Sequence, residues 1–218
     1  MAEALLDKLS EEFKSTNTTP LSEESFAWFE SKRQELKPQF ELDKEDVNIP
    51  HDLKSDGAIR DEILTDSKRR SRVFFRGRFY MFFYNPKGIN NLPYWDRFPL
   101  IFLLKVNKNK SILGLNFHYL DYHSRIQFLE NSMKWANNRP LQEKSRLLVP
   151  YEILKTTRKY RTYKAMIKRY DPKHIRSQII NIPGDEWEMA LHLPVERFRK
   201  RAKERVWLDS KRISRRLK

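Results

Sequence analysis

The residues of this sequence best suited to chemistry are Asp96, Arg97 and His118. A carboxylate, a guanidinium and an imidazole could together form a general acid–base site of the ribonuclease type. No nucleophile–base–orienter set accompanies them, so the alternative is a structural loop, Tyr94-Trp95-Asp96-Arg97, whose rings pack beside a sheet and whose carboxylate caps a turn. A third interpretation is that these rings stack on nucleic-acid bases. We favour the structural loop and predict no catalytic residue.

Metal and nucleotide sites are not predicted either. His118 and His123 flank Asp121, but they lie on either side of an expected strand-to-helix junction and lack the His-Glu-x-x-His spacing. Cysteine is absent, which excludes disulfides and thiolate zinc sites. Gly77, Gly88 and Gly114 are scattered and do not form a phosphate-binding loop. We therefore expect no metal and no cofactor.

Basic side chains interleaved with tyrosines are the strongest functional signal. Arginine and lysine suit contacts to a phosphate backbone, and aromatic rings suit base stacking. Such binding would be mainly electrostatic, with little reading of sequence. The alternative is that these residues are ordinary solvated helix faces. The predicted contacts to nucleic acid or another partner are Arg69, Arg70, Arg72, Arg158, Lys159, Arg161, Lys164, Lys168, Arg169, Arg176, Arg199, Lys200 and Arg201.

Charge is distributed unevenly along the chain. Residues 1–67 hold 8 Lys/Arg and 17 Asp/Glu, a net charge of −9, whereas residues 68–218 hold 36 and 12, a net charge of +24. The basic part suits a polyanion, most simply nucleic acid. The acidic part could fold back on the basic part or dock on a basic protein surface.

Composition narrows the class of protein. The chain has 218 residues, of which 39% are hydrophobic and 13% aromatic, so it can bury a core. No stretch approaches the roughly 20 apolar residues of a membrane span. The first residues lack the basic and apolar regions of a signal peptide. We expect no membrane partner, and a protein of a cytoplasm or of a particle assembled in one.

Hydrophobic patterning predicts the elements that must position these residues. Apolar runs between turn signals predict strands, and apolar side chains at helical spacing predict helices. The expected strands are 79–84, 99–106, 112–119 and 174–182, with a further short one within 146–154. The expected helices are 2–14, a helix capped by Ser22 that ends before Pro38, 58–67, a helix capped by Asp121 over 122–138, 160–170, and a short one from Asp185.

These elements predict an α+β fold. Short, tightly turned strands under helices suggest a small SH3-like or otherwise partly open β-barrel. We divide the chain into an acidic helical arm (1–67), a basic core domain (68–194) and a basic C-terminal helix or tail (195–218).

Several stretches of the core resemble a family of small proteins from T-even-type tailed bacteriophages. They are GRFYMFFYNPK (77–87), LPYWDRFPL (92–100), GLNFHYL (114–120), IKRY (167–170), HIRS (174–177) and EWEMALHLPVERF (186–198). The likeness covers about residues 72–200 and leaves the acidic arm outside. Proteins of this kind are described as DNA-end protectors, or as structural components of the virion, neck or baseplate. The resemblance implies a virion or assembly protein and carries over no catalytic residue.

Three functions follow from these observations. The first is a non-enzymatic phage virion or assembly protein whose basic core contacts DNA, as an end protector would. The second is a tail, baseplate or neck subunit whose charged arms bind neighbouring subunits. The third is an SH3-like nuclease. We favour the first, with DNA and other virion proteins as partners, no small-molecule substrate, and a location in the virion after assembly in the host cytoplasm.

Overall fold

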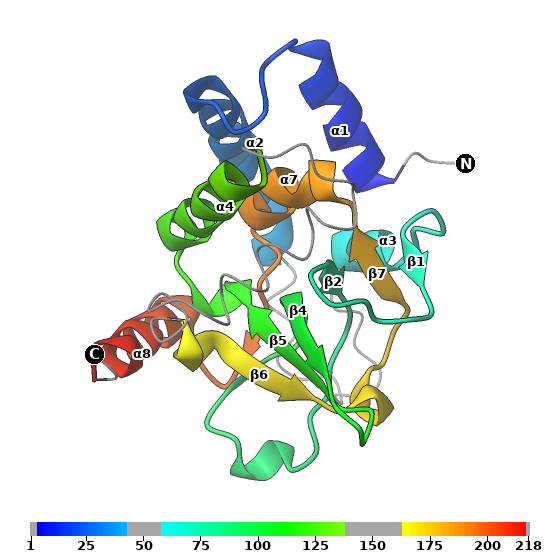
Figure 1. Ribbon diagram of the computed structural model, residues 1–218, viewed down its shortest axis with the longest axis vertical. Coiled ribbons are helices and arrows are strands. Elements are labelled where there is room, and N and C mark those ends of the chain that lie inside the picture. The colour runs from blue at the N-terminus through cyan, green and yellow to red at the C-terminus, as the bar shows by residue number, and fades with distance from the viewer. Residues whose placement is uncertain (1–3, 43–57, 138–162, 217–218) are drawn as a thin grey trace.

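The computed structural model describes residues 4–42, 58–137 and 163–216 (Figure 1). The α-helices are α1 (Leu5–Ser15), α2 (Glu23–Leu42), α3 (Ala58–Thr65), α4 (Tyr122–Asn137), α7 (Trp187–His192) and α8 (Lys203–Arg216). The strands are β1 (Arg70–Ser71), β2 (Phe79–Met81), β3 (Trp95–Asp96), β4 (Leu100–Val106), β5 (Ile112–Asn116), β6 (Ile167–Tyr170), β7 (Ile179–Ile182) and β8 (Phe198–Arg199). Short 3-10 helices are η1 (Ile89–Asn91), η2 (Phe117–Tyr119), η3 (Lys164–Met166), η4 (Pro172–His174) and η5 (Gly184–Glu186).

Six strands form one antiparallel sheet in the order β1-β7-β2-β4-β5-β6, and β3 pairs with β8 in a separate ribbon. The predicted α+β class is confirmed. Within the described residues the sheet does not close on itself, since β1 and β6 are its two edges. The SH3-like barrel that the sequence suggested is therefore not confirmed.

Strand periodicity separates the buried side chains into two clusters, because successive residues point to opposite faces of a sheet. In β2, Phe79 and Met81 belong to the large cluster and Tyr80 to the small one. In β4, Phe102 belongs to the large cluster and Leu103 to the small one. Ile179 of β7 packs against the small cluster, and Phe74 and Ile175, from connecting segments, cover that face.

Helices cover the other face. Figure 1 shows α1, α2, α4 and α7 gathered at one side of the sheet, and their buried side chains belong to the same cluster as Phe79. The ring of Trp187, at the start of α7, stacks on that of Phe79 with centroids 4.5 Å apart. The acidic N-terminal helices thus share a hydrophobic core with the basic sheet. The division of the chain at residues 67 and 194 stays a prediction.

The cap predictions are confirmed. The backbone N–H of Ser25 donates to Oγ of Ser22 at 3.1 Å, and that of Ser124 donates to Oδ1 of Asp121 at 3.1 Å. Each side chain accepts from an N–H that has no partner within its helix. These two residues start α2 and α4 where the sequence placed them.

Several predicted boundaries are wrong: β2 ends at Met81 rather than Tyr84, and β7 begins at Ile179 rather than His174. α2 continues through Pro38 to Leu42 because Leu36 and Phe40, on either side of the proline, are both buried. Their packing compensates for the backbone hydrogen bond that proline cannot donate. The third predicted strand ends at Asn116, whose side chain accepts from the backbone N–H of His118 and starts η2.

The predicted helix over 160–170 is also wrong within the part of this range that the structure describes. Residues 167–170 form β6, which pairs with β5 from Ile112↔Tyr170 to Leu115↔Ile167. The apolar spacing fitted a helix, but a strand next to β5 satisfies the open edge of the sheet. The strand predicted within 146–154 lies outside the described residues.

Candidate functional site

A cleft of about 570 Å³ opens at the end of the sheet where β6, the β4–β5 turn and the loop carrying η1 come together. The loop, which hangs below β6 in Figure 1, begins at Pro86, and Gly88 has a φ of 75° at the start of η1. Glycine adopts that left-handed conformation without steric cost. The cleft is lined by Tyr84, Pro86, Lys87, Leu92, Pro93, Tyr94, Trp95, Asp96, Asn109, Ser111, Tyr119, Lys168, Arg169, Tyr170, Asp171 and His174.

Lys168 is the half-buried cation of this cleft. Its Nζ lies 4.0 Å from the centroid of the Tyr119 ring, a cation–π contact. Burial lowers the pKa of Lys168 to about 8, because the ammonium is partly withdrawn from water. Among the described residues no carboxylate forms an ion pair with it.

Asp96 forms the cleft's inner wall, and its carboxylate is fully engaged. It accepts hydrogen bonds from Nδ2 of Asn116 at 3.0 Å, from the backbone N–H of Phe98 and Arg197, and from Nδ1 of His118 at 2.7 Å. The sequence paired Asp96 with His118, and the two side chains do meet. His118 is fully buried, and within the described part of the chain its Nε2 has no hydrogen-bond partner. The predicted turn cap by Asp96 is confirmed by its bond to Phe98.

Tyrosine hydroxyls close the floor of the cleft. The hydroxyl of Tyr170 accepts from Nδ2 of Asn116 at 3.0 Å. Burial raises the pKa values of Tyr119 and Tyr170 well above their usual range, so both remain neutral. The floor therefore supplies hydrogen-bonding groups without negative charge.

The segment after β8 holds the outer wall in place. Nζ of Lys200 donates to the carbonyl oxygens of Ile89 at 2.7 Å and Leu92 at 3.1 Å, and lies over the Trp95 ring. The guanidinium of Arg201 lies 5.3 Å from the Tyr94 ring centroid and pairs with Asp209. Lys200 and Arg201 were predicted as partner contacts, and both are exposed beside the loop whose aromatic rings they cover.

The rim of the cleft carries more basic than acidic charge. Lys87 and Arg169 are exposed and have no ion-pair partner in the described part of the chain. Asp171 is the rim carboxylate, and its side chain accepts from the backbone N–H of Lys173 at the start of η4. The cleft thus combines aromatic walls with a surplus of cations.

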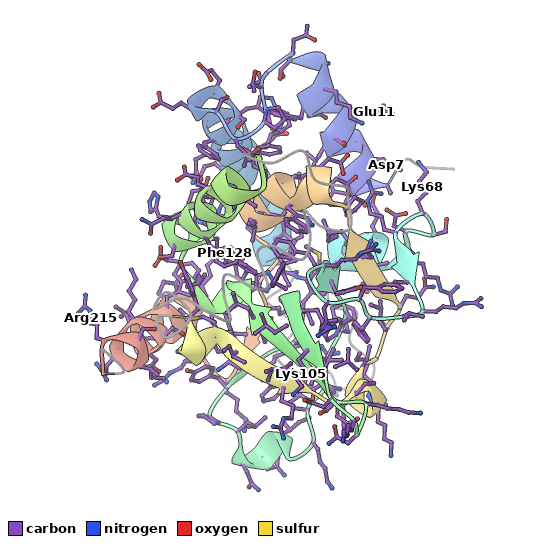
Figure 2. All side chains as sticks on the ribbon, in the orientation of Figure 1. Asp7, Glu11, Lys68, Lys105, Phe128 and Arg215 are labelled. Carbon is purple, nitrogen blue, oxygen red and sulfur yellow. The ribbon has the colours of Figure 1, made fainter. Side chains whose placement is uncertain are left out.

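Arg69 lies elsewhere and is buried. Its guanidinium forms hydrogen-bonded ion pairs with Asp66, Glu186 and Asp7, the last at 2.8 Å. Figure 2 shows Asp7 on α1 directed toward Lys68, which donates to it at 2.6 Å. Of the two alternatives for the acidic arm, folding back on the basic part is the one observed at α1. The charge of Arg69 is neutralised within the protein.

The other predicted basic residues are dispersed. Arg70 and Arg72 are exposed next to β1, at the opposite edge of the sheet from Arg169 on β6. Arg176 is exposed after η4, and Arg199 is half-buried in β8. Arg158, Lys159 and Arg161 lie outside the described residues, and of Lys164 the structure describes the backbone in η3.

Sequence reasoning did not include several cleft residues among its candidates. The sequence placed Tyr119 in a strand, Tyr170 in a helix and Lys87 in a turn. Nothing in their spacing linked them to Tyr94. Tyr170 lies two residues after Lys168 on β6 and therefore on the same face of the strand, but that signal required recognising the strand. The described residues contain no group of three or more potential metal ligands, and no described helix has the length and apolarity to span a membrane.

The chain matches the family model described as phage T4 terminal DNA protecting protein over residues 5–213. The match includes the acidic helices, which the resemblance seen in the sequence had left outside. No curated protein and no solved structure matches the chain.

Proposed function

The chain belongs to the phage T4 terminal DNA protecting protein family, and from that premise we propose that it binds the ends of linear duplex DNA through the cleft and its basic rim. The bound protein would shield the terminal nucleotides from exonucleases. The proposed contacts are Lys168, Arg169 and Lys87, with the aromatic wall at Tyr94.

The observation that supports this location is the combination of aromatic rings and unpaired cations in one concave site. Proteins that hold nucleic acid without reading sequence use aromatic platforms for bases and basic grooves for the backbone. A volume of about 570 Å³ lies within the roughly 300–1,000 Å³ range of sites that hold a small organic ligand. One terminal nucleotide is a ligand of that size, whereas the flank of an intact duplex is not.

The wider basic surface would contribute affinity without choosing the end. Residues 68–218 carry a net charge of +24, and duplex DNA attracts such a surface along its whole length. Arg70, Arg72 and Arg176 are exposed and remain proposed backbone contacts. Arg69 is excluded from the proposal because its partners are Asp7, Asp66 and Glu186.

The test compares a linear duplex with a covalently closed circle of the same sequence over a salt series. The proposal expects tighter binding to the linear form, with the preference persisting at salt concentrations that weaken binding to the circle. It also expects slower exonuclease digestion of the linear form. Equal, salt-sensitive binding to both would contradict it and favour a tail, baseplate or neck subunit whose basic surface faces acidic protein.

A paired variant locates the site. Removing the charges of Lys168 and Arg169 should abolish the preference for the linear form. Removing those of Arg205 and Arg212 on α8 is the matched control, since both are exposed and neither lines the cleft. The control should lower binding to linear and circular DNA by the same factor.

A further inference from the structure

Lys168 differs from the buried arginines in what surrounds it. Arg69 has carboxylate partners, and NH1 of Arg125 donates to Oε2 of Glu196 at 3.3 Å. Lys168 faces the Tyr119 ring and the open space of the cleft. Taking a cation out of water is unfavourable unless an anion or hydrogen-bond acceptors compensate. The arrangement at Lys168 is therefore incomplete without an anionic ligand.

Among the described residues, the carboxylates that line the cleft form no ion pair with Lys168. The Asp96 carboxylate is occupied by Asn116, His118 and two backbone donors. Asp171 stands at the rim, where its side chain caps η4. The hydroxyls of Tyr84, Tyr119 and Tyr170 stay neutral because burial raises their pKa values. A ligand must bring the negative charge.

A doubly charged group gains more from these cations than a singly charged one does. Lys168 at the wall, with Arg169 and Lys87 at the rim, outnumber the carboxylates of Asp96 and Asp171 by one. A phosphomonoester carries about −1.5 to −2 at neutral pH and offers three acceptor oxygens. In DNA such a group occurs at a strand terminus and nowhere within the chain. Lysine binds phosphate as a compact point charge.

We propose that the cleft recognises the terminal phosphomonoester of a DNA strand, with Lys168 on the phosphate, Arg169 and Lys87 at the rim, and Leu92, Pro93 and Tyr94 against the last sugar and base. This inference rests on the proposed end-binding function. It adds the chemical group by which an end is distinguished from the rest of the duplex.

The experiment measures binding of the full-length protein to one blunt duplex carrying a 5′-phosphate, a 3′-phosphate or hydroxyls at both termini, with the closed circle as reference. We expect one phosphorylated end to bind at least about tenfold more tightly than the hydroxyl end, the ratio that one charge-assisted hydrogen bond supports. Lys168→Met, which keeps the side-chain length, should remove that ratio, so that the variant binds every linear end no more tightly than the parent protein binds the hydroxyl end.

The outcomes separate the two proposals. If linear DNA is preferred over the circle but the termini bind equally, the phosphate inference is overturned and the end-binding function stands. If no linear form is preferred over the circle, the end-binding function fails and the inference fails with it. Deoxyadenosine 5′-monophosphate is a further probe, and binding as tight as that of the phosphorylated duplex would assign the cleft to a free nucleotide and overturn the inference.

Thermal unfolding tests whether Lys168→Met affects the fold as well as binding. Removing an uncompensated, half-buried charge should leave the melting temperature of Lys168→Met unchanged or raised. A marked fall in melting temperature would assign Lys168 a structural role and contradict the inference. Arg205→Ala/Arg212→Ala should leave the ratio between phosphorylated and hydroxyl ends as in the parent chain.

Discussion

Arg69 and Lys168 are both basic side chains withdrawn from water, and the fold treats them in opposite ways. Burial disfavours the charged form of Arg69, but the hydrogen bonds that its guanidinium donates to Glu186 and Asp66 raise its pKa overall. At Lys168, burial acts without a compensating carboxylate and lowers the pKa to about 8. The Arg69 cation is paired within the protein, whereas the Lys168 cation is available to a ligand. Counting basic residues cannot separate these two cases.

The largest expected effect on stability comes from removing the cation of Arg69, which is paired with carboxylates. Arg69→Met would leave Asp66, Glu186 and Asp7 facing one another without a cation, and we expect a loss of about 3–5 kcal/mol in the free energy of unfolding. Chemical denaturation measures this loss.

The neighbouring residue is the control for this prediction. Arg70 follows Arg69 as the first residue of β1 and is exposed, and Arg70→Met should change stability by less than about 0.5 kcal/mol. Equal effects of the two substitutions would show that the ion cluster does not hold α1 and η5 against β1.

His192 is a third buried base, and its effect on stability can be tested through pH. Burial lowers the pKa of His192 to about 4, and Nδ1 donates to the carbonyl oxygen of Glu188 at 2.7 Å. The unfolded chain therefore binds a proton at His192 below about pH 6.5, whereas the folded chain binds it only below about pH 4. Stability should fall across that window as pH is lowered, by up to about 3 kcal/mol for this group alone.

The variant His192→Gln isolates this contribution. Glu30, Arg33 and Arg125 also face the imidazole, and burial raises the pKa of Glu188, which favours the fold at low pH. The difference between parent and variant removes those shared contributions. The pH slope of unfolding free energy between pH 4 and 6.5 should be smaller in the variant, and identical slopes would refute the assignment.

The affinity of the cleft for phosphate should depend on pH through Lys168. Binding of a terminal phosphate favours the ammonium form of Lys168, so affinity should fall by up to about tenfold per unit as pH rises above 8. Below about pH 6 the phosphate loses charge and affinity falls again. Fluorescence anisotropy with a phosphorylated duplex measures this profile. In Lys168→Arg the decline above pH 8 should disappear, and an unchanged decline would point to another group.

The smallest effect is expected at the outer wall. Lys200→Ala removes donors to the carbonyl oxygens of Ile89 and Leu92 and should loosen the loop that carries Tyr94. We expect end binding to weaken by about two- to fivefold, with a stability loss near 1 kcal/mol. Titration with linear DNA measures the first change and thermal unfolding the second. A loss as large as that of Lys168→Met would mean that Lys200 contacts DNA directly.

The sequence predicted what depends on local pattern. The strands β2 and β4 follow from apolar runs between turn signals, and the caps at Ser22 and Asp121 follow from side-chain chemistry, and the structure contains them. Pro38 and the residues of β6 were misread because tertiary packing at Phe40 and pairing with β5 outweigh local preference.

The site was harder to predict because its parts are distant in sequence. Arg69 looked like a partner contact, since the sequence does not show that Glu186, 117 residues away, pairs with it. Tyr94 and Lys168 belonged to separate predicted segments, and the order of the sheet brings them to one cleft. The basic residues were identified, but which of them lack a partner depends on the fold.

The most direct test of the cleft as the DNA-end site is photo-crosslinking from the last base of a linear duplex, followed by mass spectrometry of the attached peptides. The account predicts crosslinks within residues 86–95 and 167–171, lost when an unlabelled phosphorylated duplex competes. Crosslinks confined to α8, or to the Arg70–Arg72 segment at the other edge of the sheet, would contradict it.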